Sequence, residues 1–341
     1  MEFQPGLASV AATSEREWLV PSVLMTALLG VSAVALMPAA GYSSPPPYFS
    51  RFINWMVWCL IGAMLAFIIY VVRLMIAGVE RPTSHIGHQL QARWGLMLVA
   101  AFGVVLAQVD MLFFMWIKPE LNAVAPFWAD PLFADVDRAI FGRDPWLFFR
   151  GMDLRFHAWA YSFFWMVAIA GTLLWLFAQP PSKGRAASII SYFAIWSLFG
   201  PVGQLLGSAA GPIFYQRIEL GDRFAGLAEN VPYVTNVVSG YLWDMHVSRQ
   251  PAVGAGISAM PSLHIATAFW IYLAFRERRS VMTHFAALFS IYMFVLSVAL
   301  GWHYAIDGVA GAAGALLCHW ASKIYVGRRE PELGQELRAA G

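Results

Sequence analysis

Eight long runs of apolar residues, separated by shorter polar segments, set the pattern of this chain. Most of them reach the roughly 20 residues that a helix needs to cross a hydrocarbon core about 30 Å thick. The pattern therefore predicts an all-α, polytopic integral membrane protein, a bundle of about eight transmembrane helices. The runs lie near residues 19–40, 53–78, 94–117, 156–179, 186–207, 261–275, 283–302 and 305–325.

Composition supports a membrane protein and narrows its partners. Hydrophobic residues make up 59% of the 341 residues and charged residues only 12%, which is more apolar than a soluble domain of this length requires. The net charge of +2 provides no broad basic surface, so we expect a lipid bilayer and no nucleic acid among the partners. The first 18 residues carry Glu2, Glu15, Arg16 and Glu17 in place of a basic start, so we interpret the first run as a retained span and not as a signal peptide.

The basic connecting segments predict an orientation. Lysine and arginine gather in the C-terminal tail and in residues 79–93, 180–185 and 276–284. All four segments lie on one side if eight spans alternate, and the positive-inside rule makes that side cytoplasmic, together with both termini. We expect a bacterial inner membrane, whose outer, periplasmic side receives residues 41–52, 118–155 and 208–260.

The residues around His264 combine the features of an anion site. The stretch "MPSLH" (260–264) enters the sixth apolar run, with Pro261 in the first helical turn, where its missing N–H does no harm. The free N–H groups of Ser262, Leu263 and His264 then point out of the helix end, where they can bind an anion. This helix end is therefore a candidate phosphate site on the outer face.

A second histidine returns to the same face. His303 follows His264 by 39 residues, which is roughly two membrane crossings at about 1.5 Å per residue. In "HYAID", Asp307 lies four residues after His303 and shares its face on a helix, so its carboxylate can hold the imidazole in one tautomer and stabilise the charged form. Two histidines beside a helix N-terminus suit a phosphoryl-transfer site with a covalent phosphohistidine.

The pair "MPSLH" and "HYAID" resembles the type 2 phosphatidic acid phosphatase superfamily, whose motifs are PSGH and SRxxxxxHxxxD. The chain is most similar to the branch of inositolphosphorylceramide synthases and related inositolphosphotransferases, which also tend to have PSLH. The resemblance implies that His303 is the nucleophile, Asp307 its orienting carboxylate and His264 the acid that protonates the leaving oxygen. It also implies that Ser262 lines the phosphate pocket.

The resemblance covers residues 94–326 as a six-span catalytic core. Residues 1–93 are then two additional spans, and residues 327–341 are a cytoplasmic tail. Two motifs depart from the family pattern: KxxxxxxRP is absent, because no lysine is followed by Arg-Pro at that spacing, and Ser297 stands where SRxxxxxHxxxD has arginine. Other cations must then balance the charge of the phosphate. The candidates on the outer loop are Arg217, Arg223 and Arg249. Each of them either binds the phosphate or is simply solvated.

Three further features carry hypotheses of lower specificity. Asp110 lies in the outer half of the third span and is either a functional intramembrane carboxylate, paired with an arginine or a headgroup hydroxyl, or a buried hydrogen-bonding group between helices. Residues 126–152 predict an amphipathic helix in the outer interface, which either frames a lipid entrance or anchors the protein. His85 and His88 lie three residues apart with no third ligand nearby, so we expect no metal and no cofactor.

The expected function is that of a membrane lipid phosphotransferase. It acts on a phospholipid or lipid phosphate through a phosphohistidine and passes the phospho-headgroup to an alcohol. With water as the acceptor, the same site is a lipid or polyprenyl phosphate phosphatase. A different class, a proton-coupled transporter with the histidines, Asp307 and Asp110 as its relay, is disfavoured because these groups gather mainly on one face.

Overall fold

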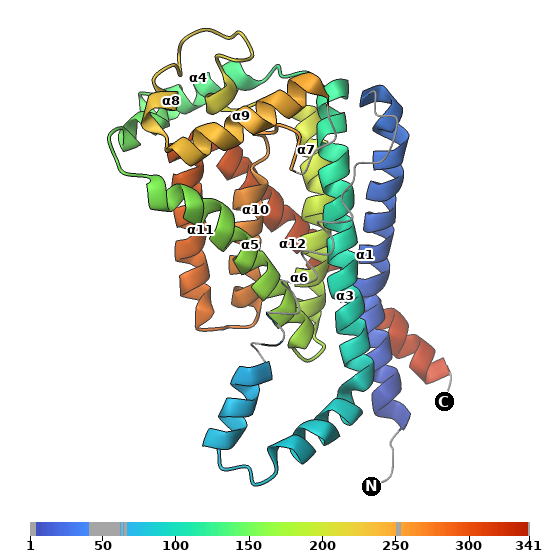
Figure 1. Cartoon of the computed structure of the whole chain (residues 1–341). Coiled ribbons are helices and arrows are strands. Elements are labelled where there is room, and N and C mark those ends of the chain that lie inside the picture. The colour runs from blue at the N-terminus through green and yellow to red at the C-terminus, as the bar shows by residue number, and fades with distance from the viewer. Residues whose placement is uncertain (1–4, 41–61, 63, 65–66, 250–253, 340–341) are drawn as a thin grey trace.

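The computed structural model describes residues 5–40, 62, 64, 67–249 and 254–339, and these residues form helices and no strand (Figure 1). The predicted all-α class is therefore confirmed. The long helices are α1 (Pro5–Ala40), α3 (Pro82–Val124), α5 (Arg155–Ala178), α6 (Lys183–Ala194), α10 (Leu263–Glu277), α11 (Met282–Ala299) and α12 (Ala305–Ala339). A π-helical turn, η2 (Ile195–Phe199), joins α6 to α7 (Gly200–Leu206).

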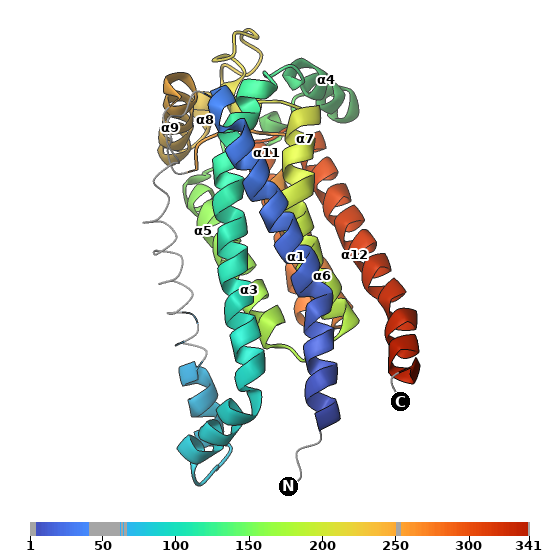
Figure 2. The ribbon, with the colours of Figure 1, turned by 90° about the vertical axis from the view of Figure 1, so that its right-hand side faces the viewer.

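The remaining helices gather at one end of this bundle. They are α4 (Asp130–Phe141), η1 (Pro145–Phe149), η3 (Pro212–Phe214), α8 (Leu227–Asn230) and α9 (Tyr233–Ser248). We call this the site end. Helix α1 begins and α12 finishes at the opposite end, as both views show (Figures 1 and 2).

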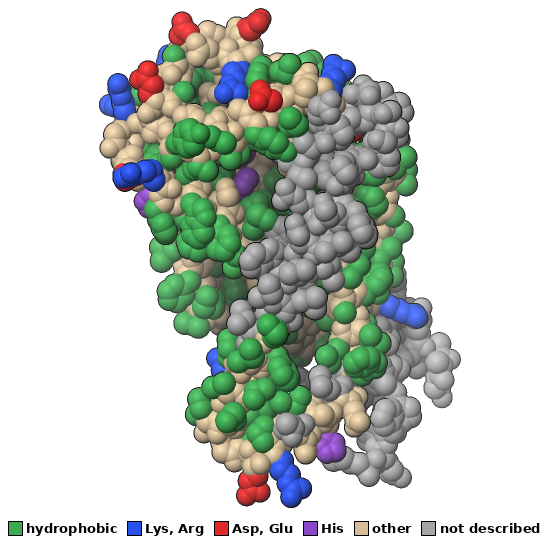
Figure 3. Space-filling view, viewed as in Figure 1, with side chains coloured by type: hydrophobic (Ala, Val, Ile, Leu, Met, Phe, Trp, Pro, Cys, Tyr) green, Lys and Arg blue, Asp and Glu red, His purple; other side chains and the backbone are tan. Residues whose placement is uncertain are grey.

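The long helices have the length and the surface of membrane spans. Among the described residues, five helical segments are apolar and long enough to cross a bilayer: Glu15–Leu36, Trp94–Val124, Arg155–Ala178, Lys183–Leu206 and Met282–Ala299. Large apolar side chains point outward on them, with Val31 67% and Leu288 64% exposed. On the part of the face in Figure 3 that is not grey, hydrophobic side chains cover the middle, and charged ones gather mainly at the two ends. The chain is thus an integral membrane protein.

Several predicted boundaries were wrong. The segment 79–93, expected as a loop, is helical from Pro82 onward, and α3 continues past residue 117 to Val124. Residues 53–61, 63, 65 and 66 of the run 53–78 lie outside the described residues, and the described part shows a short apolar helix over Phe67–Ile76. Apolar composition marks the membrane part of a helix, whereas polar residues can extend the same helix beyond the bilayer.

Helix α10 is the centre of the bundle and carries one of the two motif histidines. It packs against α5, α6, α11 and α12, and its 15 residues include a largely buried apolar set around Trp270 and Ile271. Because α10 is enclosed by helices, it needs neither the length nor the outward apolar surface of a lipid-facing span.

Helix α1 is an integral part of the bundle. It packs along α3 and α6. Near the end opposite the site, Arg185 pairs with Glu15 at 2.5 Å, and the indole N–H of Trp18 donates to the same carboxylate. Both charges are buried, so each needs the other as a partner. This buried pair fixes α1 to the start of α6.

Candidate active site

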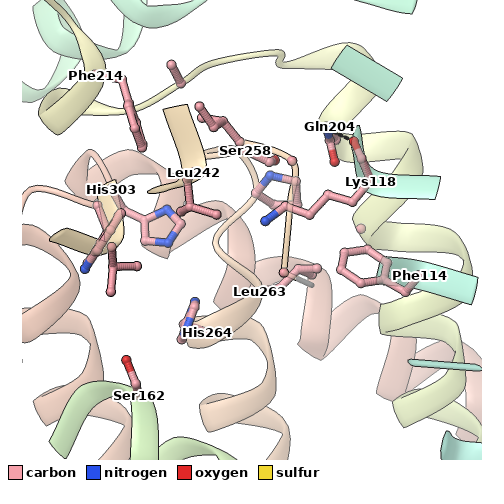
Figure 4. Close-up of a pocket in the computed structure, with 18 of the residues that line it drawn as sticks. Phe114, Lys118, Ser162, Gln204, Phe214, Leu242, Ser258, Leu263, His264 and His303 are labelled. Atoms are coloured by element: carbon pink, nitrogen blue, oxygen red, sulfur yellow. Dashed lines mark hydrogen bonds between the residues drawn. The ribbon is translucent and has the colours of Figure 1, made fainter. Parts of the chain in front are cut away.

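A cavity of about 330 Å³ opens at the site end and contains both motif histidines (Figure 4). It lies among α3, α5, α7, α9 and α10 and the loops before α10 and α12. Its polar lining consists of Lys118, Ser162, Gln204, Ser258, His264 and His303, and its aromatic lining of Phe114, Tyr161, Trp165, Trp196, Phe214, Tyr241 and Trp302. Such a mostly apolar pocket with a few convergent polar groups is typical of a ligand site.

His303 lies in the turn between α11 and α12, and its hydrogen bond determines which ring nitrogen carries the proton. Its Nδ1 lies 2.7 Å from the carbonyl oxygen of Ala259. A carbonyl oxygen only accepts hydrogen bonds, so Nδ1 carries the proton and donates it. The lone pair of the neutral ring is then on Nε2, which is the nitrogen available to attack a substrate.

Asp307 supports this histidine mainly through charge. Its Oδ2 lies 3.7 Å from Nδ1 of His303, which is too long for a hydrogen bond. The same oxygen accepts the backbone N–H of Tyr304 at 2.8 Å, the reciprocal half of a capping box at the start of α12. The carbonyl of Ala259 therefore fixes the tautomer, and the buried carboxylate stabilises positive charge on the ring.

His264 lies in the first turn of α10 and lines the same cavity as His303. The two ring centroids are 6.0 Å apart. The His264 ring also contacts Tyr161, at 4.6 Å and nearly parallel, and Trp165, at 4.0 Å. The structure thus brings the two predicted histidines together on one cavity, with Asp307 behind the first and an aromatic wall against the second.

Ser262 has a different place from the predicted one. Helix α10 begins at Leu263, so Ser262 is the N-cap: its Oγ accepts the N–H of Ile265 at 3.4 Å, and its own N–H donates to the carbonyl of Asp307. The side chain is fully buried and does not line the cavity. Gly311 of α12 allows this close approach, because a Cβ there would lie 2.4 Å from the carbonyl oxygen of Ser262. Ser262 therefore connects the two motif segments, and its neighbours in the sequence line the cavity in its place.

Lys118 is the cation of the cavity that sequence reasoning missed. Because α3 extends to Val124, Lys118 lies on a helix and reaches from α3 toward the middle of the cavity, while its carbonyl accepts from the Gln204 side chain at 2.9 Å (Figure 4). A signal was present: Ala125 and Pro126 follow Lys118 at the spacing of the Arg-Pro of KxxxxxxRP. Because the search for KxxxxxxRP required the arginine, it missed a segment that keeps only the lysine and the proline of the motif.

The three predicted arginines lie outside the lining of this cavity. Arg223 bonds Asp144, Asp135 and the carbonyl of Ala134. Arg217 donates to the carbonyl of Ser239 at 3.3 Å and lies over the ring of Trp243. Arg249 borders a separate pocket of about 460 Å³. The prediction did not anticipate that local partners would occupy Arg217 and Arg223.

Of the predicted amphipathic helix over 126–152, the structure forms α4 over Asp130–Phe141 and the short η1 over Pro145–Phe149, and the buried stripe of α4 carries two carboxylates. Asp130 accepts the N–H groups of Ala210 and Gly211, both at 2.8 Å, and the hydroxyl of Tyr304 at 2.9 Å. Asp137 accepts the first two N–H groups of α12 at 2.6 and 3.0 Å. Helix α4 therefore clamps the loops that carry the site, while α9 borders the cavity.

The carboxylates of this clamp differ in their pKa. Burial raises the pKa of Asp130 and of Asp137, although the N–H groups that each accepts oppose the shift. Burial acts in the same direction on Asp144. There, hydrogen bonds and charge from Arg223 and Arg138 outweigh it and hold the pKa of Asp144 below the usual value. Asp144 is thus ionised and stabilising in the fold.

Asp110 has partners within the protein. The hydroxyls of Thr26 and Ser197 donate to its Oδ1 at 2.9 and 2.5 Å, so it links α1, α3 and the π turn η2. The residue before Ser197 in that turn, Trp196, lines the cavity. No cluster of three potential metal ligands occurs among the described residues.

Comparisons with known proteins identify the family. The model of the PAP2 superfamily matches residues 143–321, a narrower range than the 94–326 predicted from the motifs, and it contains both His264 and His303 but not Lys118. Searches of curated proteins and of solved structures found no match. Because the matched segment spans more than half of the chain and includes the cavity's two histidines, the chain belongs to the PAP2 superfamily.

Proposed function

We propose that this protein transfers a phospho-headgroup from a membrane phospholipid to an alcohol through a phosphohistidine at His303. Membership of the PAP2 superfamily supports a hydrolase or transferase of phosphate esters in general. The observation that carries the proposal is the hydrogen bond from Nδ1 of His303 to the carbonyl of Ala259. It leaves Nε2 as a nucleophile on the cavity that also holds His264 and Lys118.

The first half-reaction forms the phosphohistidine. Nε2 of His303 attacks phosphorus, the bond from phosphorus to the lipid alcohol breaks, and His264 gives its proton to the departing oxygen. Lys118 offsets the negative charge of the phosphate oxygens, and Asp307 offsets the positive charge on the His303 ring. Diacylglycerol leaves when the donor is a glycerophospholipid.

The second half-reaction reverses these roles. An acceptor hydroxyl attacks phosphorus, the bond from Nε2 to phosphorus breaks, and His264 takes the proton of the hydroxyl. An aromatic cavity favours transfer over hydrolysis because it limits water and holds the alcohol close to the phosphohistidine. The PSLH sequence, shared with the inositolphosphotransferase-like branch, favours the same choice.

We place the cavity on the outer face of the membrane. The basic segments 180–185 and 276–284 follow or precede helix ends that lie opposite the site end (Figure 1), and the positive-inside rule assigns such segments to the cytoplasm. Cysteine labelling at Ser280 and at Arg217 in intact cells tests this orientation. Labelling of both positions from the same side would contradict it.

The activity is tested with purified protein in detergent. Phosphatidylglycerol, phosphatidylinositol and phosphatidate are supplied with and without glycerol, and mass spectrometry identifies the products. We expect diacylglycerol, a phosphate adduct on the peptide that contains His303, and a product that requires glycerol: a new phosphodiester from phosphatidylglycerol or phosphatidylinositol, and glycerol phosphate from phosphatidate. Formation of only the water-derived product at every glycerol concentration would make the protein a lipid phosphatase.

A matched pair of histidine variants controls this experiment. His303→Ala should lose essentially all turnover and the adduct. His157→Ala should keep both, because His157 also lies at the site end but bonds the hydroxyl of Tyr292 at 2.7 Å and does not line the cavity. Normal turnover in His303→Ala would overturn the mechanism.

A further inference from the structure

Helix α5 supplies the wall of the cavity next to His264. Tyr161, Ser162 and Trp165 line the cavity, and they lie outside both histidine motifs. The Tyr161 ring lies 4.6 Å from the His264 ring with an angle of 20° between their planes. Any alcohol that exchanges a proton with His264 must therefore lie against this part of α5.

Two hydroxyl groups on this wall have no partner among the described residues. The Tyr161 hydroxyl is fully buried and accepts and donates no hydrogen bond. Ser162 is exposed to the cavity, and its hydroxyl points toward the side on which His264 lies (Figure 4). A buried hydroxyl without a partner costs about 1–3 kcal/mol. A bound polar ligand would remove that cost.

The neighbouring Trp165 is different, because its polar group is already used. Its indole N–H donates to the hydroxyl of Thr267 at 2.8 Å, which fixes the ring 4.0 Å from that of His264. The wall therefore combines a fixed aromatic face with two free hydroxyls, the combination that a small alcohol with an apolar carbon skeleton and more than one oxygen would fill.

We propose that Tyr161 and Ser162 bind the alcohol of the reaction through a second oxygen, one carbon away from the hydroxyl that reacts. This inference rests on the proposed function, in which His264 serves both the leaving and the attacking alcohol. Both alcohols then occupy one subsite and share this chemistry: the glycerol carbon next to the phosphoester carries an ester oxygen in a glycerophospholipid, and a polyol carries a hydroxyl there.

Competition between two acceptors of similar size tests this subsite. Glycerol has the neighbouring hydroxyl, and 1-propanol lacks it. Both are supplied together with a donor phospholipid that the wild type cleaves, and mass spectrometry measures the ratio of the glycerol ester to the propanol ester. We expect the wild type to favour glycerol, and Tyr161→Phe and Ser162→Ala each to lower the ratio about 3–10-fold, the effect of one lost hydrogen bond.

Two controls separate binding from folding. Tyr161→Phe keeps the ring against His264, so the variant should unfold at a temperature close to that of the wild type, while its rate of donor cleavage should fall by no more than about the same 3–10-fold, because the donor's ester oxygen loses the same hydrogen bond. Tyr292→Phe removes a hydroxyl that bonds His157 at the same end of the bundle and should leave the acceptor ratio unchanged.

The outcomes distinguish the two proposals. Phosphodiester products with an acceptor ratio that neither variant changes would overturn the subsite and leave the transferase intact. A wild-type protein that forms only the water-derived product would overturn both, because no acceptor alcohol would then be bound. Ratios that fall in both variants and stay constant in Tyr292→Phe would support the subsite.

Discussion

Replacing Asp144 by asparagine should loosen the clamp that α4 forms over the site. Asp144 is buried and accepts Arg223 at 2.7 and 3.0 Å through one oxygen and Arg138 at 2.6 Å through the other. An asparagine keeps the size of the side chain but removes its charge. Arg223 then loses its buried counter-charge, and the contact between the 217–230 segment and α4 weakens.

The structure sets the size of the effect. Removing one partner of a buried ion pair costs about 3–5 kcal/mol, but Arg223 keeps Asp135 and the carbonyl of Ala134 as partners. The half-exposed Arg138 contributes about 1 kcal/mol or less. We therefore expect Asp144→Asn to lower the free energy of unfolding by about 2–3 kcal/mol. At roughly 2 °C per kcal/mol for a chain of this size, the melting temperature should fall by about 4–6 °C.

The effect should depend on pH in one direction. The pKa of Asp144 is lowered in the fold because the hydrogen bonds and charges of the two arginines outweigh burial. Its contribution is therefore complete above the ordinary aspartate value of about 3.9 and disappears as the pH falls through the lower, folded value. The difference in the free energy of unfolding between wild type and Asp144→Asn should be complete at pH 7 and should shrink below about pH 4.

Thermal unfolding in detergent across this pH range checks the reasoning. Asp135→Asn is the matched control, since Asp135 bonds the same arginine but its side chain is 72% exposed; its melting temperature should stay within about 1–2 °C of the wild type. An Asp144→Asn protein as stable as the wild type at pH 7, or a difference that persists unchanged to pH 3, would refute the assignment of this ion pair.

Four further predictions follow from other contacts of the site. Asp137→Ala removes the acceptor for the first two N–H groups of α12, so the free energy of unfolding should fall by about 1–3 kcal/mol in thermal denaturation. Gly211 has φ +104°, and a Cβ there would lie 2.5 Å from the carbonyl oxygen of Trp302, so Gly211→Ala should cost about 2 kcal/mol or more; wild-type melting would contradict this. Lys118→Met should lower turnover about 100-fold, and Lys118→Arg should lower it less, because charge at the phosphate is the property required. EDTA should leave turnover intact, and a loss that a divalent ion restores would contradict the absence of a catalytic metal.

The sequence determined the fold class and the two histidines for simple geometric reasons. Apolar runs of bilayer length have few structures other than a helix open to them, because each backbone N–H and C=O needs a partner within the membrane. The 39 residues from His264 to His303 form two successive packed helices, α10 and α11, so the return of the chain to the same end could be expected from helix rise. A local pattern was sufficient wherever the membrane limited the alternatives.

Only the tertiary structure decided which polar groups complete the site. The sequence favoured Arg217, Arg223 and Arg249 over Lys118, but the packing of α3 against the loop before α10 places the lysine on the cavity, while Arg217 and Arg223 have partners elsewhere. The hydrogen bond from His303 to Ala259 joins residues 44 positions apart, and the carboxylate of Asp137 on α4 accepts N–H groups of α12 from more than 160 residues away. Such contacts depend on the packing of several helices at once, and no periodicity within one segment encodes them.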